Sequence, residues 1–422
     1  MYIAYDATRL KYYLDYLIEH CILAVAFFLP LSLNATSLFL AVGAVSWLAK
    51  MLVSRRVAFK RTPFDEVIAI FVILAAASIW ESPDRNFSFY NFYHLMGRYI
   101  LIYYLVINNI CSTVQLKRII YMLLGSAVVV TIYGFYQYIY KVDISAFEWV
   151  DGEQFPDLKV RVFSTLQNPN LLAGFLVTVM SMAVGLACKV RQSKTKLLLF
   201  GLVAMFGTCL VLTYSRGAWL SVIAVIGTYG LIYNRRILWL LLIIPVIVMY
   251  AHDVLERLLS IINPTDTSST LRLALWESTW SMIVDKPLFG IGWGAYWLVY
   301  PEYDFFVQNT GTKIFHAHNM YLNIAAEIGI PGLLAFLAIM YGHARTALQI
   351  FNNTTDYWMA GLMLGIVSAI VGLAVSGFTD YVMFNIQMSM LFWLLNALVV
   401  VARQELCRCN CNFFDRITTK FH

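Results

Sequence analysis

Residues 168–188 read NPNLLAGFLVTVMSMAVGLAC, a stretch that contains no charged side chain. A bilayer core is about 30 Å thick, and a helix of about 20 apolar residues is long enough to cross it. Similar stretches recur along the chain, so we predict an all-α polytopic membrane protein with about 12 transmembrane helices. The predicted spans are 17–33, 35–53, 64–81, 97–111, 118–140, 168–188, 197–214, 217–233, 236–251, 319–343, 357–378 and 383–402.

The composition of the whole chain supports this class of protein. Of its 422 residues, 60% are hydrophobic and only 13% are charged, and the mean hydropathy is +0.70. Soluble domains carry about 25% charged residues. The formal net charge of +6 is explained by basic loops on one side of a membrane, so we predict no nucleic-acid partner.

Basic residues are unevenly divided between the two sets of loops that alternate along the predicted spans. One set contains about 20 of the 30 Lys and Arg residues, and the positive-inside rule assigns it to the cytoplasm. Both termini are then cytoplasmic, with residues 1–16 as the N-terminal segment and 403–422 as the tail. Residues 17–402 form the transmembrane domain, which includes a long, partly helical outer loop, 252–318, between spans nine and ten.

The outer loop 252–318 is rich in aromatic residues, which favours an ordered, functional segment over a disordered linker. Apolar residues at positions 273, 276, 280 and 283 recur at helical spacing, so we predict a short helix lying along the membrane surface. Arg272 and Trp276 share one stripe of this helix. Arg272 either contacts lipid headgroups or belongs to an anion site.

The same loop contains the glycine-rich segment Gly290-Ile291-Gly292-Trp293-Gly294. A nucleotide-binding loop requires the order strand, glycine loop, helix, which is absent here. We predict a tight turn that lets Trp293 and Tyr296 stack on sugar rings or lipid.

Three predicted spans begin at the outer face with residues suited to an anion. Each helix start has unpaired N–H groups and a partial positive charge of about half a unit, so three neighbouring starts form an anion site. Arg216 is either an interfacial arginine that reaches toward lipid or, with Arg272, a clamp for the two phosphates of a polyprenyl diphosphate. The three starts are Asn168-Pro169-Asn170, Ser215-Arg216-Gly217 and His318-Asn319.

Two histidines, His316 and His318, precede the tenth predicted span. A His-x-His pair can ligate zinc, but no outer cysteine supports such a site and the nearby carboxylates have no motif spacing, so we predict no metal. We predict instead that His318 acts as a general base or hydrogen-bond donor. Glu327 lies on the opposite face of the helix that follows, and we predict a structural role for it.

In their order along the chain, these motifs resemble those of the O-antigen ligase family of bacterial inner-membrane glycosyltransferases. That family also includes O-antigen polymerases and protein O-oligosaccharyltransferases. The resemblance extends over residues of about 160 to 332. The matching elements are Phe163-Ser164-Thr165-Leu166-Gln167-Asn168-Pro169-Asn170 with Gly174, Ser215-Arg216-Gly217, Arg272 with Trp276, Pro287-Leu288-Phe289-Gly290-Ile291-Gly292-Trp293-Gly294, and His318-Asn319 followed by Leu322, Glu327, Gly329 and Gly332.

The resemblance implies an enzyme without metal or cofactor that transfers a glycan from undecaprenyl diphosphate to a sugar hydroxyl of lipid A-core. The reaction would take place at the periplasmic face, and the partners would be the lipid-linked donor, the lipid A-core acceptor and membrane lipids. By motif match, the family's two essential arginines are Arg216 and Arg272, and its histidine is His318. We predict further substrate contacts from six residues: Asn168, Asn170, Ser215, Asn319, Trp276 and His316.

Three alternative functions remain open. A polymerase would use the same donor to extend another lipid-linked glycan, and a protein O-oligosaccharyltransferase would glycosylate Ser or Thr. The non-enzyme alternative is a membrane transporter. Transporters usually place charged residues near the bilayer midplane, whereas the notable polar residues here lie at the predicted outer edge. We therefore predict a glycosyltransferase of the lipid-linked oligosaccharide ligase type.

Overall fold

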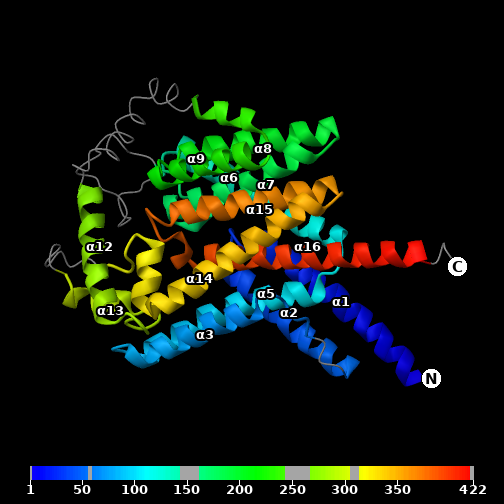
Figure 1. The fold of residues 1–422 in the computed structure, drawn as a ribbon, viewed down its shortest axis with the longest axis horizontal. Helices are drawn as coiled ribbons and strands as arrows, with labels where there is room; N and C mark the ends of the chain where they lie inside the picture. Colours follow the sequence, from blue (N-terminus) through cyan, green and yellow to red (C-terminus); the bar gives the residue numbers. More distant parts are fainter. Residues whose placement is uncertain (1, 56–58, 143–160, 243–266, 305–312, 419–422) are drawn as a thin grey trace.

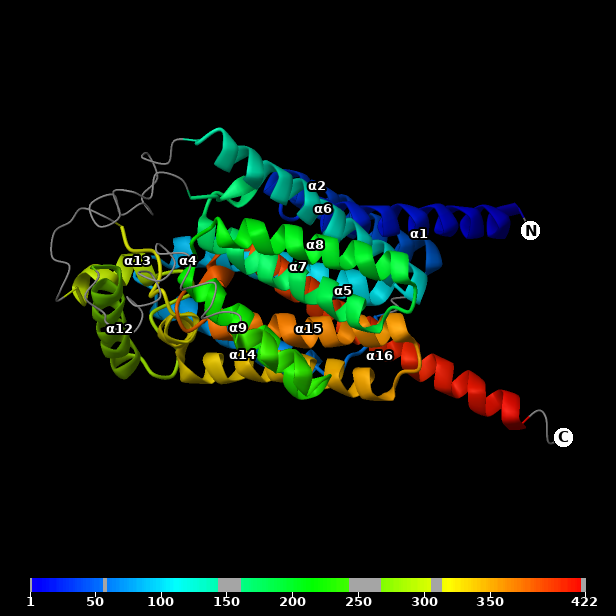
Figure 2. The same ribbon diagram turned by 90° about the horizontal axis from the view of Figure 1, so that it is seen from above.

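The computed structural model describes residues 2–55, 59–142, 161–242, 267–304 and 313–418. Most helices run side by side as one bundle (Figures 1 and 2), and these residues contain no β-strand, so the all-α prediction is confirmed. The α-helices are α1 (Tyr2–Phe28), α2 (Leu33–Ser54), α3 (Asp65–Ser78), α4 (Arg85–Asn91), α5 (Gly97–Asn109), α6 (Thr113–Ile139), α7 (Pro169–Lys189), α8 (Ser193–Val211), α9 (Arg216–Ile232), α12 (Thr267–Asp285), α13 (Tyr296–Val299), α14 (Met320–Asn353), α15 (Tyr357–Ser376) and α16 (Ile386–Thr418).

Seven of the described helices are long and apolar enough to cross a membrane: α2, α6, α7, α8, α14, α15 and the part of α16 from Ile386 to Cys407. The chain is therefore an integral, multi-pass membrane protein. Helices α1, α3, α5 and α9 cover four further predicted spans, and the total of about 12 stays a prediction. The predicted span 236–251 is described only as far as Leu242, where η4 (Arg235–Leu242) is a 3₁₀-helix.

The two ends of the bundle differ. Helices α12 and α13 lie at one end, and α12 runs across this end at a steep angle to the long helices (Figures 1 and 2). Helix α1 begins and α16 ends at the other end. We call these the α12 end and the terminal end. The predicted short helix around Arg272 is thus present, and helical structure extends through much of the predicted terminal segments 1–16 and 403–422.

Helices α7 and α15 approach each other so closely that only glycine fits between them. A Cβ atom added at Gly185 of α7 would lie 2.3 Å from the carbonyl oxygen of Gly361 and 2.7 Å from the backbone nitrogen of Gly365, both in α15. Small residues at such crossings allow extensive van der Waals contact between helices in membranes. This contact fixes α7, whose first residues line the candidate site.

We expect Gly185→Ala to lower the free energy of unfolding by about 1–3 kcal/mol, because an added methyl group meets backbone atoms that cannot rotate away. Thermal unfolding in detergent measures this effect. Gly201→Ala in α8 is the matched control, because no heavy atom lies within 4 Å of its added Cβ. Equal stability of the Gly185→Ala and Gly201→Ala proteins would contradict the close approach of α7 and α15.

A break in α14 provides the docking site for the glycine-rich segment. Gly329 interrupts the helix with φ 77° and ψ 170°, and a Cβ atom at this position would lie 2.2 Å from the carbonyl oxygen of Leu288. Three backbone hydrogen bonds join the two segments: Ile291 N–H to Ala326 O at 2.8 Å, Gly292 N–H to Glu327 O at 3.1 Å, and Ile330 N–H to Pro287 O at 2.8 Å. Segment 287–294 and the first part of α14 therefore form one packed unit.

Candidate active site

A cavity of about 810 Å³ lies at the α12 end of the bundle. Its walls come from α4, α7, α9, α12, α13, the segment before α14 and the segment between α15 and α16. Of the nine predicted site residues, seven line this cavity: Asn168, Asn170, Ser215, Arg216, Arg272, His316 and His318. The structure thus brings together residues that lie up to 150 positions apart in the sequence.

The start of α7 forms one wall. Asn168 caps the helix, because its side-chain oxygen accepts hydrogen bonds from the backbone N–H groups of Asn170 at 2.8 Å and Leu171 at 3.4 Å. Pro169 occupies the first helical position, where its missing N–H has no cost. Asn170 then projects its amide toward Asp380 and donates a hydrogen bond of 2.7 Å. Both asparagines therefore have structural roles at the cavity edge.

The start of α9 forms a second wall. Ser215 is the N-cap residue, and its side chain makes no capping hydrogen bond. Tyr214 has a φ of 52°, in the left-handed region, which costs energy for a residue with a side chain. This sharp turn places Tyr214, Ser215, Arg216 and Gly217 together on the cavity lining. The start of α9 therefore contributes both a guanidinium group and a helix N-terminus.

Three arginines line the cavity: Arg161, Arg216 and Arg272. Arg161 Nε donates a hydrogen bond of 3.1 Å to the carbonyl oxygen of Thr213, which holds this side chain beside the turn before α9. Guanidinium groups stay charged in proteins and bind phosphate oxygens through parallel N–H donors. Together with the helix starts, the arginines make this part of the cavity suitable for a ligand with several negative charges.

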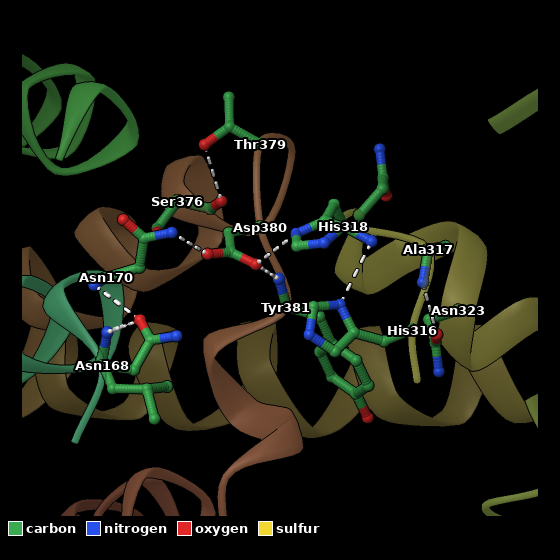
Figure 3. A network of polar contacts seen from close by, with 12 residues as sticks. Asn168, Asn170, His316, Ala317, His318, Asn323, Ser376, Thr379, Asp380 and Tyr381 are labelled. Atoms are coloured by element: carbon green, nitrogen blue, oxygen red, sulfur yellow. Dashed lines mark hydrogen bonds and ion pairs between the residues drawn. The ribbon is translucent and has the colours of Figure 1, made fainter. Parts of the chain in front are cut away.

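His318 and Asp380 form a pair at the centre of the site (Figure 3). The Nδ1 atom of His318 lies 3.2 Å from Oδ1 of Asp380. The same carboxylate accepts hydrogen bonds from the amide of Asn170 and, at 2.8 Å, from the backbone N–H of Tyr381. A carboxylate bonded to Nδ1 favours the tautomer with the proton on Nδ1 and leaves Nε2 as the acceptor. His318 is thereby oriented as a base.

Asp380 is held in its charged form. Burial alone favours the neutral acid, but the hydrogen bond from His318 and the electrostatic interactions with His318, His316 and the Arg272 guanidinium outweigh it and lower the pKa of Asp380 well below its usual range. The carboxylate is therefore ionised at neutral pH. It balances part of the positive charge in the cavity.

His316 differs from His318 in its surroundings. Burial lowers the pKa of His316 to about 3, and the electrostatic interactions with His318 and the Arg272 guanidinium act in the same direction, against the effect of Asp380. Its Nδ1 accepts a hydrogen bond from the backbone N–H of His318 at 3.3 Å, as a neutral imidazole does. His316 thus stays neutral at physiological pH, and it supports the turn in which His318 has a φ of 47°.

The two imidazoles and Asp380 also have to be considered as metal ligands. Among the described residues, one ligand atom from each of His316, His318 and Asp380 lies within 4.8 Å of the others. Sequence reasoning predicted no metal and did not include Asp380. Hydrogen bonds already use one ring nitrogen of each histidine and both carboxylate oxygens, and a metal would have to replace some of them.

Two predicted substrate-binding residues are not on the cavity lining. Asn319 is the N-cap of α14: its side-chain oxygen accepts from the N–H groups of Tyr321 at 3.0 Å and Leu322 at 3.1 Å, and its amide donates to the Phe378 carbonyl at 3.3 Å. Trp276 is half-buried in α12, and its indole N–H is buried without a hydrogen-bond partner. The structure thus gives Asn319 the role of a helix cap.

Glu327 of α14 contacts the glycine-rich segment. It is 7% exposed, and its carboxylate accepts a hydrogen bond of 3.1 Å from the backbone N–H of Gly294. It therefore ties the glycine-rich segment to α14, which agrees with the structural role predicted from the sequence.

Several lining residues were missed by sequence reasoning. Asp380 lies two residues after the predicted span 357–378. A carboxylate at the same predicted membrane edge as His318 was a signal that could have identified it. Arg161 lies close to the motif that begins at Phe163. The lining residues from α4, Phe87 and Asn91, belong to the N-terminal half, where the sequence offers no motif.

Comparison with known proteins finds similar sequences for part of the chain. Residues 198–337 match the model of the O-antigen ligase family. A Rickettsia typhi protein named as a candidate polysaccharide ligase is 29% identical over 98 residues, which are 22% of this chain and 23% of that protein. A Rickettsia conorii protein of the same description is 28% identical over 118 residues, 26% of this chain and 28% of the relative. The matched segments thus cover about a quarter of each relative's length.

The helices and the cavity define the class: an integral membrane protein with a cationic site at one end of its bundle. More specifically, the chain carries an O-antigen ligase family domain, so the resemblance seen in its motifs is confirmed. Arg216, Arg272 and His318 all lie within the matched residues 198–337.

Proposed function

We propose that this protein is an O-antigen ligase that transfers a glycan from undecaprenyl diphosphate to a sugar hydroxyl of lipid A-core. In this proposal the chain lies in a bacterial inner membrane, with both termini in the cytoplasm and the cavity on the periplasmic side. The main supporting observation is that Arg216, Arg272 and His318 line a single cavity together with the starts of α7 and α9.

The arginines act on the donor. Arg216 and Arg272 bind the two phosphates, and negative charge grows on the diphosphate as its bond to the sugar breaks. Donors that are already in place stabilise this charge more in the transition state than in the ground state. Arg161 adds a third positive charge on the same lining.

His318 acts on the acceptor. Its Nε2 takes the proton of the sugar hydroxyl while the hydroxyl oxygen forms a bond to the anomeric carbon of the donor. The bond between that carbon and the diphosphate oxygen breaks, and undecaprenyl diphosphate leaves with the electron pair. Asp380, bonded to Nδ1, stabilises the imidazolium that results. Attack from the face opposite the leaving group inverts the anomeric configuration.

A reconstituted assay tests the proposal and its rivals. The purified protein receives an undecaprenyl-diphosphate glycan and one of three acceptors: lipid A-core, a second lipid-linked glycan, or a peptide with Ser and Thr. We expect a product only with lipid A-core. A product formed only with the second glycan would identify a polymerase, and glycosylated peptide would identify a protein O-oligosaccharyltransferase. Movement of a lipid-linked glycan or an inorganic anion across vesicles, without transfer, would identify a transporter.

We expect chelation to leave the transfer rate unchanged, because guanidinium groups supply the positive charge that a divalent metal supplies in other phosphate chemistry. The measurement is the rate in the same assay after dialysis against EDTA, with and without added Zn²⁺ or Mg²⁺. If EDTA abolished transfer and Zn²⁺ restored it, the group His316, His318 and Asp380 would be a metal site and the base assignment would be wrong.

A further inference from the structure

Aromatic side chains from three separate segments gather on one part of the cavity lining. They are Phe87 of α4, Trp297 of α13 and Phe315 of the segment before α14. The centroids of the Phe87 and Trp297 rings lie 5.7 Å apart at an interplanar angle of 79°, and those of Trp297 and Phe315 lie 6.3 Å apart. We call these three residues the aromatic wall.

Trp297 is held in place by its neighbours. The Lys313 ammonium nitrogen lies 4.9 Å from the centroid of the indole ring, and Phe87 meets the ring edge to face. Aromatic and cation contacts of this kind restrict the ring orientation. Trp297 is only half-buried and lines the cavity, so it presents a fixed apolar surface there. Tyr296, for which we predicted such a role, is fully buried and bonded to Thr279 at 2.7 Å.

The aromatic wall and the start of α9 come from different elements of the cavity lining. Figure 1 shows α13 at the lower left of the bundle, beside α12, and α9 in its upper half. Arg216 is the first residue of α9, while Trp297 is in α13 and contacts Phe87 of α4. If the phosphates of a ligand lie at Arg216, the aromatic wall contacts a different part of the same ligand or a second ligand.

We propose that the aromatic wall, with the Asn91 amide beside it, binds a pyranose ring of a glycan. This inference rests on the proposed function, because it assigns one substrate class to part of the same cavity. A pyranose ring has an apolar face of C–H groups that packs on the negative face of an aromatic ring, and hydroxyl groups at its rim that require hydrogen-bond partners. Asn91 lines the same cavity and offers both a donor and an acceptor.

A prenyl chain is the competing occupant of an apolar surface. Such a chain has no polar atom for Asn91, and burial of an amide without a partner is unfavourable. Pockets that combine aromatic rings with a few placed polar groups are typical of sites that orient a polar ligand. These properties favour a sugar ring, which can belong to the acceptor or to the transferred glycan.

Equilibrium binding tests the wall without any transfer step. The full-length protein in detergent is titrated with two soluble probes, the oligosaccharide released from lipid A-core and the oligosaccharide released from the donor. We expect Trp297→Ala to weaken binding of one probe about tenfold, the effect of one stacking ring, and Trp297→Tyr to restore most of it. The probe that loses affinity identifies whether the wall holds the acceptor or the transferred glycan.

Trp80→Ala is the matched control. Trp80 lies before α4, is 73% exposed and packs on Arg85, so this variant should bind both probes like the unchanged protein. Equal binding of both probes by the Trp297→Ala and unchanged proteins would overturn the proposal. So would the failure of the unchanged protein to bind either probe, or displacement of a bound probe by a short-chain polyprenol that depends on Trp297.

The proposed function and the aromatic wall can fail separately. If the unchanged protein binds a probe through Trp297 but transfers no glycan to any acceptor, the wall stands and the ligase function does not. If transfer occurs and Trp297→Ala changes neither probe binding nor the KM of either substrate, the function stands and the wall does not.

Discussion

We expect Arg216→Ala and Arg272→Ala each to reduce the rate of glycan transfer by about 10²–10³-fold or more. That range is typical for the loss of one positioned donor that stabilises a developing negative charge. Each substitution removes one guanidinium group from the cavity lining. The remaining arginines and the helix starts lie at other positions on this lining and do not replace it. The measurement is kcat/KM for the lipid-linked donor, together with the amount of folded protein recovered from membranes.

Two further variants make this prediction specific. Arg216→Lys keeps the charge but loses the planar fork, so we expect it to recover only part of the activity. Arg85→Ala is the control at the same end of the bundle, because Arg85 packs on Trp80 and does not line the cavity. Activity within a few fold of the unchanged protein for Arg216→Ala or Arg272→Ala would remove that arginine from the mechanism.

We expect Asp380→Asn to reduce kcat by about 10²-fold or more while the protein stays folded. The substitution keeps the size of the side chain but removes the charge that stabilises an imidazolium, and an amide can present N–H instead of oxygen to His318. The carboxylate is ionised in the unchanged protein because its pKa lies well below the usual range. Single-turnover rates with saturating donor and acceptor measure the effect on the chemical step.

Substitution of each histidine in turn distinguishes the proposed base, His318, from its neighbour His316. His318→Ala should abolish transfer, since it removes the proton acceptor itself. His316→Gln should cost less, because His316 is neutral and its Nδ1 accepts only a backbone hydrogen bond, which a glutamine oxygen can replace. If His316→Gln abolished transfer and His318→Ala did not, the roles assigned to these residues would be reversed.

The fold class was predictable because lipid imposes a simple rule on sequence. Apolar stretches of sufficient length have to be helices in a bilayer, and those at α7, α14 and α15 needed no knowledge of their neighbours. The start of α7 was predictable for the same local reason, because Asn168 caps this helix as its side chain suggests. The shorter helices α3 and α5 pack against α14 and α16, and the identity of these neighbours could not be predicted from sequence.

The candidate site could be predicted only in part. Arg216, Arg272 and His318 stood out because charged or titratable groups at a membrane edge are unusual. Asn319 was assigned to substrate because its motif position suggested it, whereas the structure uses it to cap a helix. Asp380 and the α4 residues depend on which helices are neighbours, and periodicity within one helix contains no information about that. These residues could therefore be assigned to the site only from the structure.

The docking of segment 287–294 onto the break in α14 has a mechanical consequence. The hydrogen bonds that join them run from backbone to backbone, and Trp297 and His318 lie a few residues outside this joint, one on each of the two segments. Displacement of the tryptophan would therefore be transmitted to the imidazole. Arg216 belongs to α9, outside that unit, and α9 packs against α15, which in turn packs against α14. The distance between this guanidinium group and the imidazole therefore depends on how α15 packs between the two helices.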